Sequence, residues 1–232
     1  MTHGDSTHDG YDNGAYDGKV SVGGPSAQRT AGPLTITKIA VGDMDNNAYF
    51  LRCSETGDLV LIDAAAEPDR LIGVLNALDG PRVTAIVTTH QHGDHWQALP
   101  ELVATTGAPV IAHPLDAGPL PVNSVTSVED GDTIPVGTCT LSVIHLVGHT
   151  PGSIALLFEG PDRPHLFTGD SLFPGGVGLT TNPEDFASLH HDVSTKLFDR
   201  LPDDTWVYPG HGGDTTLGAE RPHLEEWRER GW

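Results

Sequence analysis

Residues 88 to 96 of this chain read Thr-Thr-His-Gln-His-Gly-Asp-His-Trp and place four potential metal ligands within six positions: His90, His92, Asp94 and His95. Neutral imidazole nitrogens and ionised carboxylates are donors that Zn²⁺, Fe²⁺ and Mn²⁺ accept, and one loop can turn several of them toward one centre. The alternative is a polar loop that is rich in histidine by chance. Whether the loop binds metal or is rich in histidine by chance therefore depends on donors elsewhere in the chain.

Further potential ligands follow other apolar runs, just as the histidine loop follows residues 84–87. His149 comes after the run at 138–146, Asp170 after 166–168 and His211 after 205–208, each in a loop that contains glycine. Strand ends on one rim of a sheet can hold side chains from distant sequence positions in convergent geometry. The pattern therefore favours one shared site over chance.

The elements that would position these loops alternate between strand-like and helix-like patterns. Short β-type runs cover residues 34–41, 47–53, 59–62, 83–88, 108–112, 138–146 and 154–158. Helical spacing predicts helices over 64–78, from about 94 to 107, over 182–201 as one amphipathic helix, and from 220 to the end. Residues 114–137 are rich in Pro, Gly and Asp and are interpreted as connections.

The first 32 residues have few aliphatic side chains, so they cannot bury enough apolar surface to offset the entropy of ordering. We expect residues 1–32 to be a disordered N-terminal tail, with His3 and His8 as bystanders. Residues 33–232 are expected to form one domain, because 232 residues suffice for one substantial core.

Composition narrows the partners and the chemistry. Twelve Lys and Arg against 32 Asp and Glu give a formal net charge of −20, which argues against nucleic acid or an anionic membrane as a partner. Cys53 and Cys139, the two cysteines, are expected to be buried thiols and not a metal cluster. The sequence shows neither a membrane-spanning apolar run nor the pattern of a signal peptide, so the expected location is the cytoplasm.

Taken together, the motif His90-x-His92-x-Asp94-His95 with His149, Asp170 and His211 resembles the metallo-β-lactamase superfamily. The segments Gly148-His149-Thr150-Pro151-Gly152-Ser153, Gly169-Asp170-Ser171-Leu172-Phe173 and Pro209-Gly210-His211-Gly212 are most similar to its glyoxalase II-like (hydroxyacylglutathione hydrolase-like) hydrolases. The resemblance covers residues 34 to about 218. It implies an α/β (α+β) fold, a four-layer αβ/βα sandwich with a dinuclear metal site on its rim.

The resemblance also assigns roles to the seven residues. His90, His92 and His149 would hold one divalent ion, Asp94, His95 and His211 the other, and Asp170 would bridge them. Zn²⁺ is the expected ion, and Fe²⁺ or Mn²⁺ suit the same donors. A water shared by two such ions has a lowered pKa and supplies hydroxide at neutral pH, which would cleave a thioester or ester of a small molecule. Asp94 would orient this nucleophile as well as bind metal.

Departures from the subfamilies leave alternatives open. The sequence after Asp170 and His211 lacks the basic and aromatic residues with which glyoxalase II enzymes bind glutathione, and Phe173 stands where related lactonases place a tyrosine. Persulfide dioxygenase-like oxidation at a single iron and lactone hydrolysis remain the alternatives. The small-molecule substrate is unidentified, and the sequence does not distinguish a monomer from a homodimer.

Histidines outside the motif are expected to be packing, surface or supporting residues. His113 and His145 flank ligand-bearing segments and are the strongest candidates for supporting the ligands. The same expectation covers the other histidines of the domain: His165, His190, His191 and His223.

Overall fold

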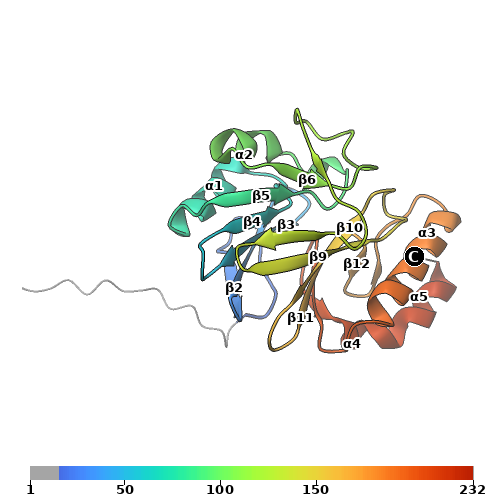
Figure 1. The fold of residues 1–232 in the computed structure, drawn as a ribbon. Coiled ribbons are helices and arrows are strands. Elements are labelled where there is room, and N and C mark those ends of the chain that lie inside the picture. The colour runs from blue at the N-terminus through green and yellow to red at the C-terminus, as the bar shows by residue number, and fades with distance from the viewer. Residues whose placement is uncertain (1–15, 232) are drawn as a thin grey trace, which may run out of the picture.

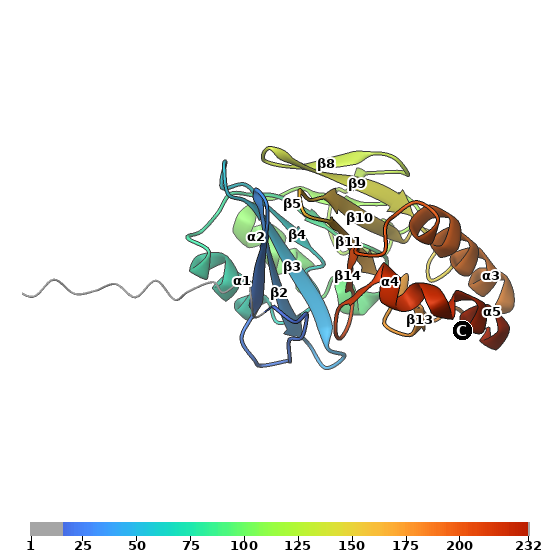
Figure 2. The same ribbon diagram turned by 90° about the horizontal axis from the view of Figure 1, so that it is seen from below.

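The computed structural model describes residues 16–231, and these form helix, sheet, sheet and helix layers, as Figures 1 and 2 show. One sheet has the strand order β1-β2-β3-β4-β5-β6-β7. Its strands are β1 (Ala27–Ala31), β2 (Leu34–Val41), β3 (Asn46–Cys53), β4 (Leu59–Ile62), β5 (Val83–Val87), β6 (Val110–Ala112) and β7 (Thr126–Ser127).

The second sheet has the order β15-β14-β11-β10-β9-β8, and a small separate hairpin joins β12 to β13. The strands of this half are β8 (Thr133–Val136), β9 (Cys139–His145), β10 (Ile154–Glu159), β11 (Pro164–Gly169), β12 (Leu172–Phe173), β13 (Gly176–Val177), β14 (Trp206–Pro209) and β15 (Thr215–Thr216). The predicted αβ/βα sandwich is confirmed.

Helices cover the outer faces of the two sheets (Figure 2). The first sheet carries α1 (Pro68–Ala77), the 3₁₀ turn η1 (Gly93–His95) and α2 (Leu99–Thr106). The second half carries α3 (Pro183–Asp192), the π-helical turn η2 (Val193–Phe198), α4 (Leu217–Glu220), the 3₁₀ turn η3 (Arg221–His223) and α5 (Leu224–Arg230). None of the described helices is long and apolar enough to cross a membrane.

Central strands of both sheets, such as β4 and β10, are buried on two faces, which explains why they are nearly continuous apolar runs. Successive residues of β10 alternate between two cores: Leu156 faces the core between the sheets, whereas Ala155 and Leu157 face the helices. On β3, Tyr49 likewise faces the core between the sheets, whereas Phe50 faces the helices. Because side chains alternate along a strand, one apolar run serves both layers.

The predicted disordered tail is wrong for the part of it that the structure describes. Residues 27–31 form β1 and pair with β2, and the Arg29 guanidinium lies 4.4 Å from the Trp206 ring centre. The Tyr16 hydroxyl donates to Asp214 at 2.7 Å. Main-chain pairing and aromatic contacts, which a count of aliphatic residues misses, order this segment. His3 and His8 lie outside the described residues.

Several element boundaries also differ from the sequence interpretation. The first helix begins at Pro68. The buried residues 64–66 lie outside it, and the carbonyls of Ala64 and Ala65 accept hydrogen bonds from the amides of Ala98 and Gln97. The helix expected from Asp94 is a 3₁₀ turn followed by α2, and the single helix expected over 182–201 changes to π-helical hydrogen bonding at Val193. The closing helix from 220 is divided into α4, η3 and α5, and the expected connections at 114–137 contain β7 and β8.

A buried ion pair joins the N-terminal half to the loop after β14. Lys38 Nζ lies 2.6 Å from Asp214 Oδ1, both side chains are fully buried, and the ammonium also donates to the carbonyl of Gly212 at 2.7 Å. We expect Lys38→Met to lower the free energy of unfolding by about 3 kcal/mol, because it leaves the Asp214 carboxylate buried without its cation. Urea denaturation measures this.

The exposed Lys19 provides the matched control, since Lys19→Met removes the same charge from the surface. A loss in Lys38→Met no larger than the loss in Lys19→Met would contradict a structural role for the buried pair.

Candidate metal centre

Strand direction brings the seven candidate ligands to one rim. β4 runs parallel to β5, and β11 runs parallel to β14, so the carboxyl ends of each pair lie at the same edge. The histidine loop follows β5, Asp170 follows β11 and His211 follows β14. β9 is antiparallel to β10, which is antiparallel to β11, so the β9–β10 loop with His149 reaches the same edge.

Main-chain hydrogen bonds tie the two sheets together beside the ligands. The amide of Asn47 donates to the carbonyl of Gly210 at 2.7 Å, and the amide of Ile154 donates to that of Thr89 at 3.0 Å. Both bonds join a strand of one sheet to a ligand loop of the other. The ligand loops are therefore parts of one framework.

The donor atoms form three overlapping groups in which all atoms lie within 4.8 Å of one another. The groups are His90, His92 and His149; His90, His95 and Asp170; and Asp94, His95 and His211. The first and third are the two ligand sets that the resemblance implies. The structure thus brings together all seven residues predicted from the sequence.

The spacing within the third group fits coordination of a metal ion. Donors on a tetrahedral ion with bonds of 2.0–2.1 Å are about 3.3 Å apart. The Nε2 atoms of His95 and His211 are 3.2 Å apart, and they lie 3.5 and 3.3 Å from Oδ2 of Asp94. Three edges of one group therefore match one tetrahedral face.

Asp170 lies between the two halves of the cluster. Its Oδ1 is 3.4 Å from His95 Nε2, and its Oδ2 is 3.3 Å from His211 Nε2 and 3.6 Å from His149 Nε2. Burial would raise the pKa of Asp170, but its contacts with the His211 and His95 imidazoles outweigh burial and hold the pKa below its ordinary value. The group is an ionised carboxylate in contact with both ligand sets.

Several donors are buried without any hydrogen-bond partner among the described residues. These atoms are Nε2 of His90, Nε2 of His149 and Oδ1 of Asp170. A buried polar atom without a partner is costly, so such atoms concentrated in one place indicate a bound ion. Burial, helped by the neighbouring His95, lowers the pKa of His90 well below its ordinary value and keeps it in the neutral form that binds metal.

In four of the ligand imidazoles Nδ1 already has a hydrogen-bond partner, which directs Nε2 toward the cluster. Nδ1 of His149 donates to the carbonyl of Leu179 at 2.7 Å, and Nδ1 of His211 to that of Met44 at 2.8 Å. His95 Nδ1 lies 2.9 Å from the Asp63 carboxylate, and His90 Nδ1 lies 3.0 Å from the hydroxyl of Thr89. Such outer contacts fix the tautomer and orientation of metal-binding histidines.

Asp63 is a supporting residue that the sequence interpretation missed. It follows β4 and is buried, with φ at 55°, and its carboxylate accepts hydrogen bonds from the amide and the hydroxyl of Thr89, both at 2.8 Å. Together with the contact to His95, these bonds link the end of β4 to the histidine loop. The signal was present, because Asp63 directly follows an apolar run as the ligands do.

We expect Asp63→Asn to weaken metal binding by roughly 10- to 100-fold, because the His95 imidazole loses the carboxylate that orients it. Titration with a chromophoric chelator measures the affinity. Asp79→Asn is a matched control, since Asp79 is exposed and also has a left-handed backbone, with φ at 62°. Equal metal affinity in both variants would rule out the supporting role.

Two further supporting residues had no recognisable sequence signal. Asn46 Nδ2 donates to Asp94 Oδ2 at 2.8 Å. Asp116, buried in the connection after β6, accepts the amide of Gln91 at 3.0 Å and that of Gly152 at 2.8 Å. Asp116 therefore links the histidine loop to the His149 loop.

The histidines outside the motif have other contacts. His113 and His145 stack with ring centres 4.0 Å apart, and His145 donates to the carbonyl of Pro151 in the His149 loop. His165 is buried against the Tyr208 hydroxyl, and His223 pairs with Glu226.

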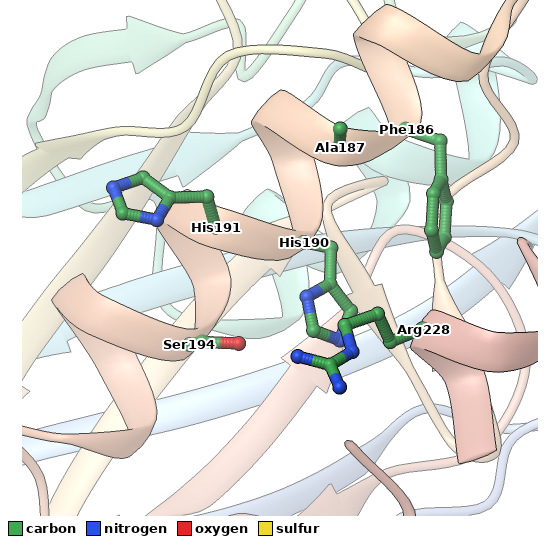
Figure 3. A pocket seen from close by; sticks show the side chains of 6 residues that line it. All are labelled: Phe186, Ala187, His190, His191, Ser194 and Arg228. Carbon is green, nitrogen blue, oxygen red and sulfur yellow. The ribbon is translucent and has the colours of Figure 1, made fainter. Parts of the chain in front are cut away.

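The remaining two, His190 and His191, line a hollow of about 500 Å³ between α3 and α5, which Figure 3 shows. Phe186 and Arg228 lie on its walls, and none of the seven ligands lines it. This hollow is therefore separate from the candidate metal centre.

Most of the chain is similar in sequence to known proteins. The family model described as the metallo-beta-lactamase superfamily matches residues 41–211. The chain is 40% identical over 207 residues to a hydroxyacylglutathione hydrolase of Fuscovulum blasticum, covering 81% of this chain and 76% of that protein. It is 35% identical over 180 residues to one of Polaromonas sp. (strain JS666 / ATCC BAA-500), covering 77% of this chain and 66% of that protein's length.

Two solved structures have folds similar to that of this chain. ETHE1 from Myxococcus xanthus superposes with a TM-score of 0.71 at 29% identity, covering 84% of each chain. TTHA1623, described in a di-iron-bound form, superposes with a TM-score of 0.66 at 34% identity, covering 79% of this chain and 96% of the other. By sequence, fold and donor geometry, this chain belongs to the metallo-β-lactamase superfamily.

Proposed function

We propose that this protein is a metal-dependent hydrolase that cleaves the thioester or ester bond of a small molecule, in the manner of the glyoxalase II-like enzymes. The observation that carries the proposal is the complete set of seven donors with Asp170 in contact with both halves. Relatives named hydroxyacylglutathione hydrolase, at 35% and 40% identity, support the same reaction class.

The ligands are proposed to divide into two sets. His90, His92 and His149 would hold one ion, and Asp94, His95 and His211 the other, with Asp170 shared between them. When bound, two divalent ions would lower the pKa of water toward neutrality and polarise the carbonyl of the substrate. Zn²⁺ suits the donors, and iron is a second candidate because TTHA1623 is described in a di-iron form.

Asp94 is proposed to orient the attacking water as well as to bind metal. Its side chain is 19% exposed, and its Oδ2 accepts a hydrogen bond from Asn46 at 2.8 Å. Burial alone would raise the pKa of Asp94, but the Asn46 hydrogen bond helps to hold it below the ordinary value. An ionised, partly exposed carboxylate fixed on one side can accept a proton from water on the other.

The test combines metal analysis with activity. Purified protein is expected to hold about two equivalents of divalent metal and to hydrolyse thioesters, and His92→Ala is expected to abolish most of this activity. Less than about one equivalent of metal, together with undiminished thioesterase activity in His92→Ala, would refute the hydrolase.

A second candidate is persulfide dioxygenase-like oxidation at a single iron. His90, His95 and Asp170 form one of the three donor groups, and two histidines with one carboxylate are the donor set of non-haem iron oxygenases. Oxygen consumption with glutathione persulfide would favour this reaction. Full hydrolase activity in the absence of oxygen would favour the first candidate. Lactone hydrolysis is a further alternative, which a comparison of thioester, ester and lactone substrates would distinguish.

A further inference from the structure

Two exposed apolar residues accept hydrogen bonds, through their main-chain carbonyls, from ligand imidazoles of the candidate metal centre. The carbonyl of Met44, in the turn between β2 and β3, accepts the hydrogen bond of His211 Nδ1 at 2.8 Å. The carbonyl of Leu179, between β13 and α3, accepts that of His149 Nδ1 at 2.7 Å. Because His211 and His149 both contact the same oxygen of Asp170, the two residues flank the cluster from different elements.

The side chains of these two residues are unusually exposed. Met44 is 62% exposed and Leu179 is 82% exposed, and only two other large hydrophobic residues of the described chain, Val22 and Leu115, belong to the same exposed set. Isolated exposed aliphatic side chains are common and carry little meaning alone. Here their position is informative, since each residue holds a ligand imidazole with its own main chain.

Phe173 is a third apolar residue near His211. Its half-buried ring lies 6.2 Å from the ring of His211, centre to centre, and it is placed by the β12–β13 hairpin. His211 therefore has an aromatic ring near its imidazole and a methionine as its main-chain hydrogen-bond partner. Such a pair suits an aliphatic chain of variable length.

The turn between β2 and β3 carries acidic side chains. Met44 is flanked in sequence by Asp43 and Asp45, and Asp43 is exposed. Lys38 reaches the His211 loop at Gly212, but its ammonium is buried and paired with Asp214.

At the β12–β13 turn, Arg230 donates to the carbonyl of Gly175 and lies 3.3 Å from Glu226. Lys38 and Arg230 are thus each paired with a carboxylate. A thiol carrier with two carboxylates, such as glutathione, would meet acidic groups at the turn between β2 and β3.

We propose that Met44 and Leu179 form an apolar lip that selects substrates with an aliphatic acyl chain joined to an uncharged leaving group. This inference rests on the proposed hydrolase function and assigns its substrate class. The acyl chain lies across the lip while its carbonyl reaches the cluster. An uncharged leaving group is not repelled electrostatically by Asp43 and Asp45.

The experiment measures kcat/KM for acetyl, butyryl and hexanoyl thioesters of N-acetylcysteamine, which is neutral, and of glutathione. For the neutral series, kcat/KM is expected to rise roughly two- to threefold for each added methylene, because each one is withdrawn from water at the lip. For each acyl group, the neutral thioester is expected to exceed the glutathione thioester. Both expectations are tested in the unmodified protein.

Variants then locate the effect. Met44→Ser and Leu179→Ser retain the carbonyls that hold His211 and His149, so metal content is expected to persist while the dependence on chain length flattens. Val22→Ser is the matched control, since Val22 is also exposed and belongs to the N-terminal segment near α1.

The possible results distinguish failure of the apolar lip from failure of the proposed hydrolase function. No dependence on chain length, an unchanged dependence in both lip variants, or a preference for glutathione thioesters would overturn the apolar lip while leaving the hydrolase intact. No hydrolysis of either series would overturn the apolar lip together with the thioesterase activity on which it rests.

Discussion

Replacing Asp170 with alanine is expected to lower kcat/KM for thioester hydrolysis by more than about 100-fold and to lower the metal content of the purified protein. Removing an outer contact of a metal ligand already costs 10- to 100-fold, and Asp170 contacts both ligand sets directly. The variant leaves His95, His149 and His211 without the carboxylate that they share. Metal analysis and steady-state kinetics measure the two effects.

Asp204→Ala is the control for this variant, because Asp204 is an exposed aspartate just before the buried Thr205. It should keep full activity and metal content. An Asp170→Ala protein that retained two equivalents of metal and full activity would show that Asp170 does not join the two halves.

A single methyl group at Gly210 is expected to disrupt the centre nearly as strongly. A Cβ at this position would lie 2.1 Å from Oδ1 of Asp170 and 2.8 Å from Cε1 of His95. The main chain cannot move aside easily, because the Gly210 amide donates to Gly169 at 2.8 Å and its carbonyl accepts from Asn47 at 2.7 Å. Gly210→Ala should therefore displace the Asp170 carboxylate.

The expected result for Gly210→Ala is metal binding that is at least about tenfold weaker, with a loss of about 1–3 kcal/mol in the free energy of unfolding from overpacking. Chelator competition and urea denaturation measure these quantities. Gly213→Ala, three residues away, is the matched control, since a Cβ there meets no heavy atom within 4 Å. Equal metal affinity in the two variants would contradict the steric explanation.

Much of the fold was predictable because burial on two faces produces continuous apolar runs. Strands β4, β5, β10 and β14 stand out for this reason, and each ends or begins at a glycine-containing or polar loop. Strand β1 was not predicted, because hydrogen bonding to β2 and contacts of Arg29 with aromatic rings order it without aliphatic burial. Strand β8 was hidden in a segment rich in turn residues.

The supporting residues around the ligands were less accessible to sequence reasoning. Asp63 could have been found by applying the rule that located the ligands, since it too follows an apolar strand. Asp116 could not, because its hydrogen bonds to Gln91 and Gly152 join segments that are distant in sequence. Hydrogen-bond direction is a property of three-dimensional placement and leaves no periodic trace.

The sequence by itself determined which residues are the candidate ligands, because donors with metal-binding chemistry recur directly after apolar runs, and the histidine loop alone holds four of the seven. Only the tertiary structure decided that they converge. The parallel pairing of β4 with β5 and of β11 with β14 places their carboxyl ends at common edges, and main-chain bonds between the sheets bring those edges together. It also decided which residues hold the ligand imidazoles through their carbonyls, among them the exposed Met44 and Leu179.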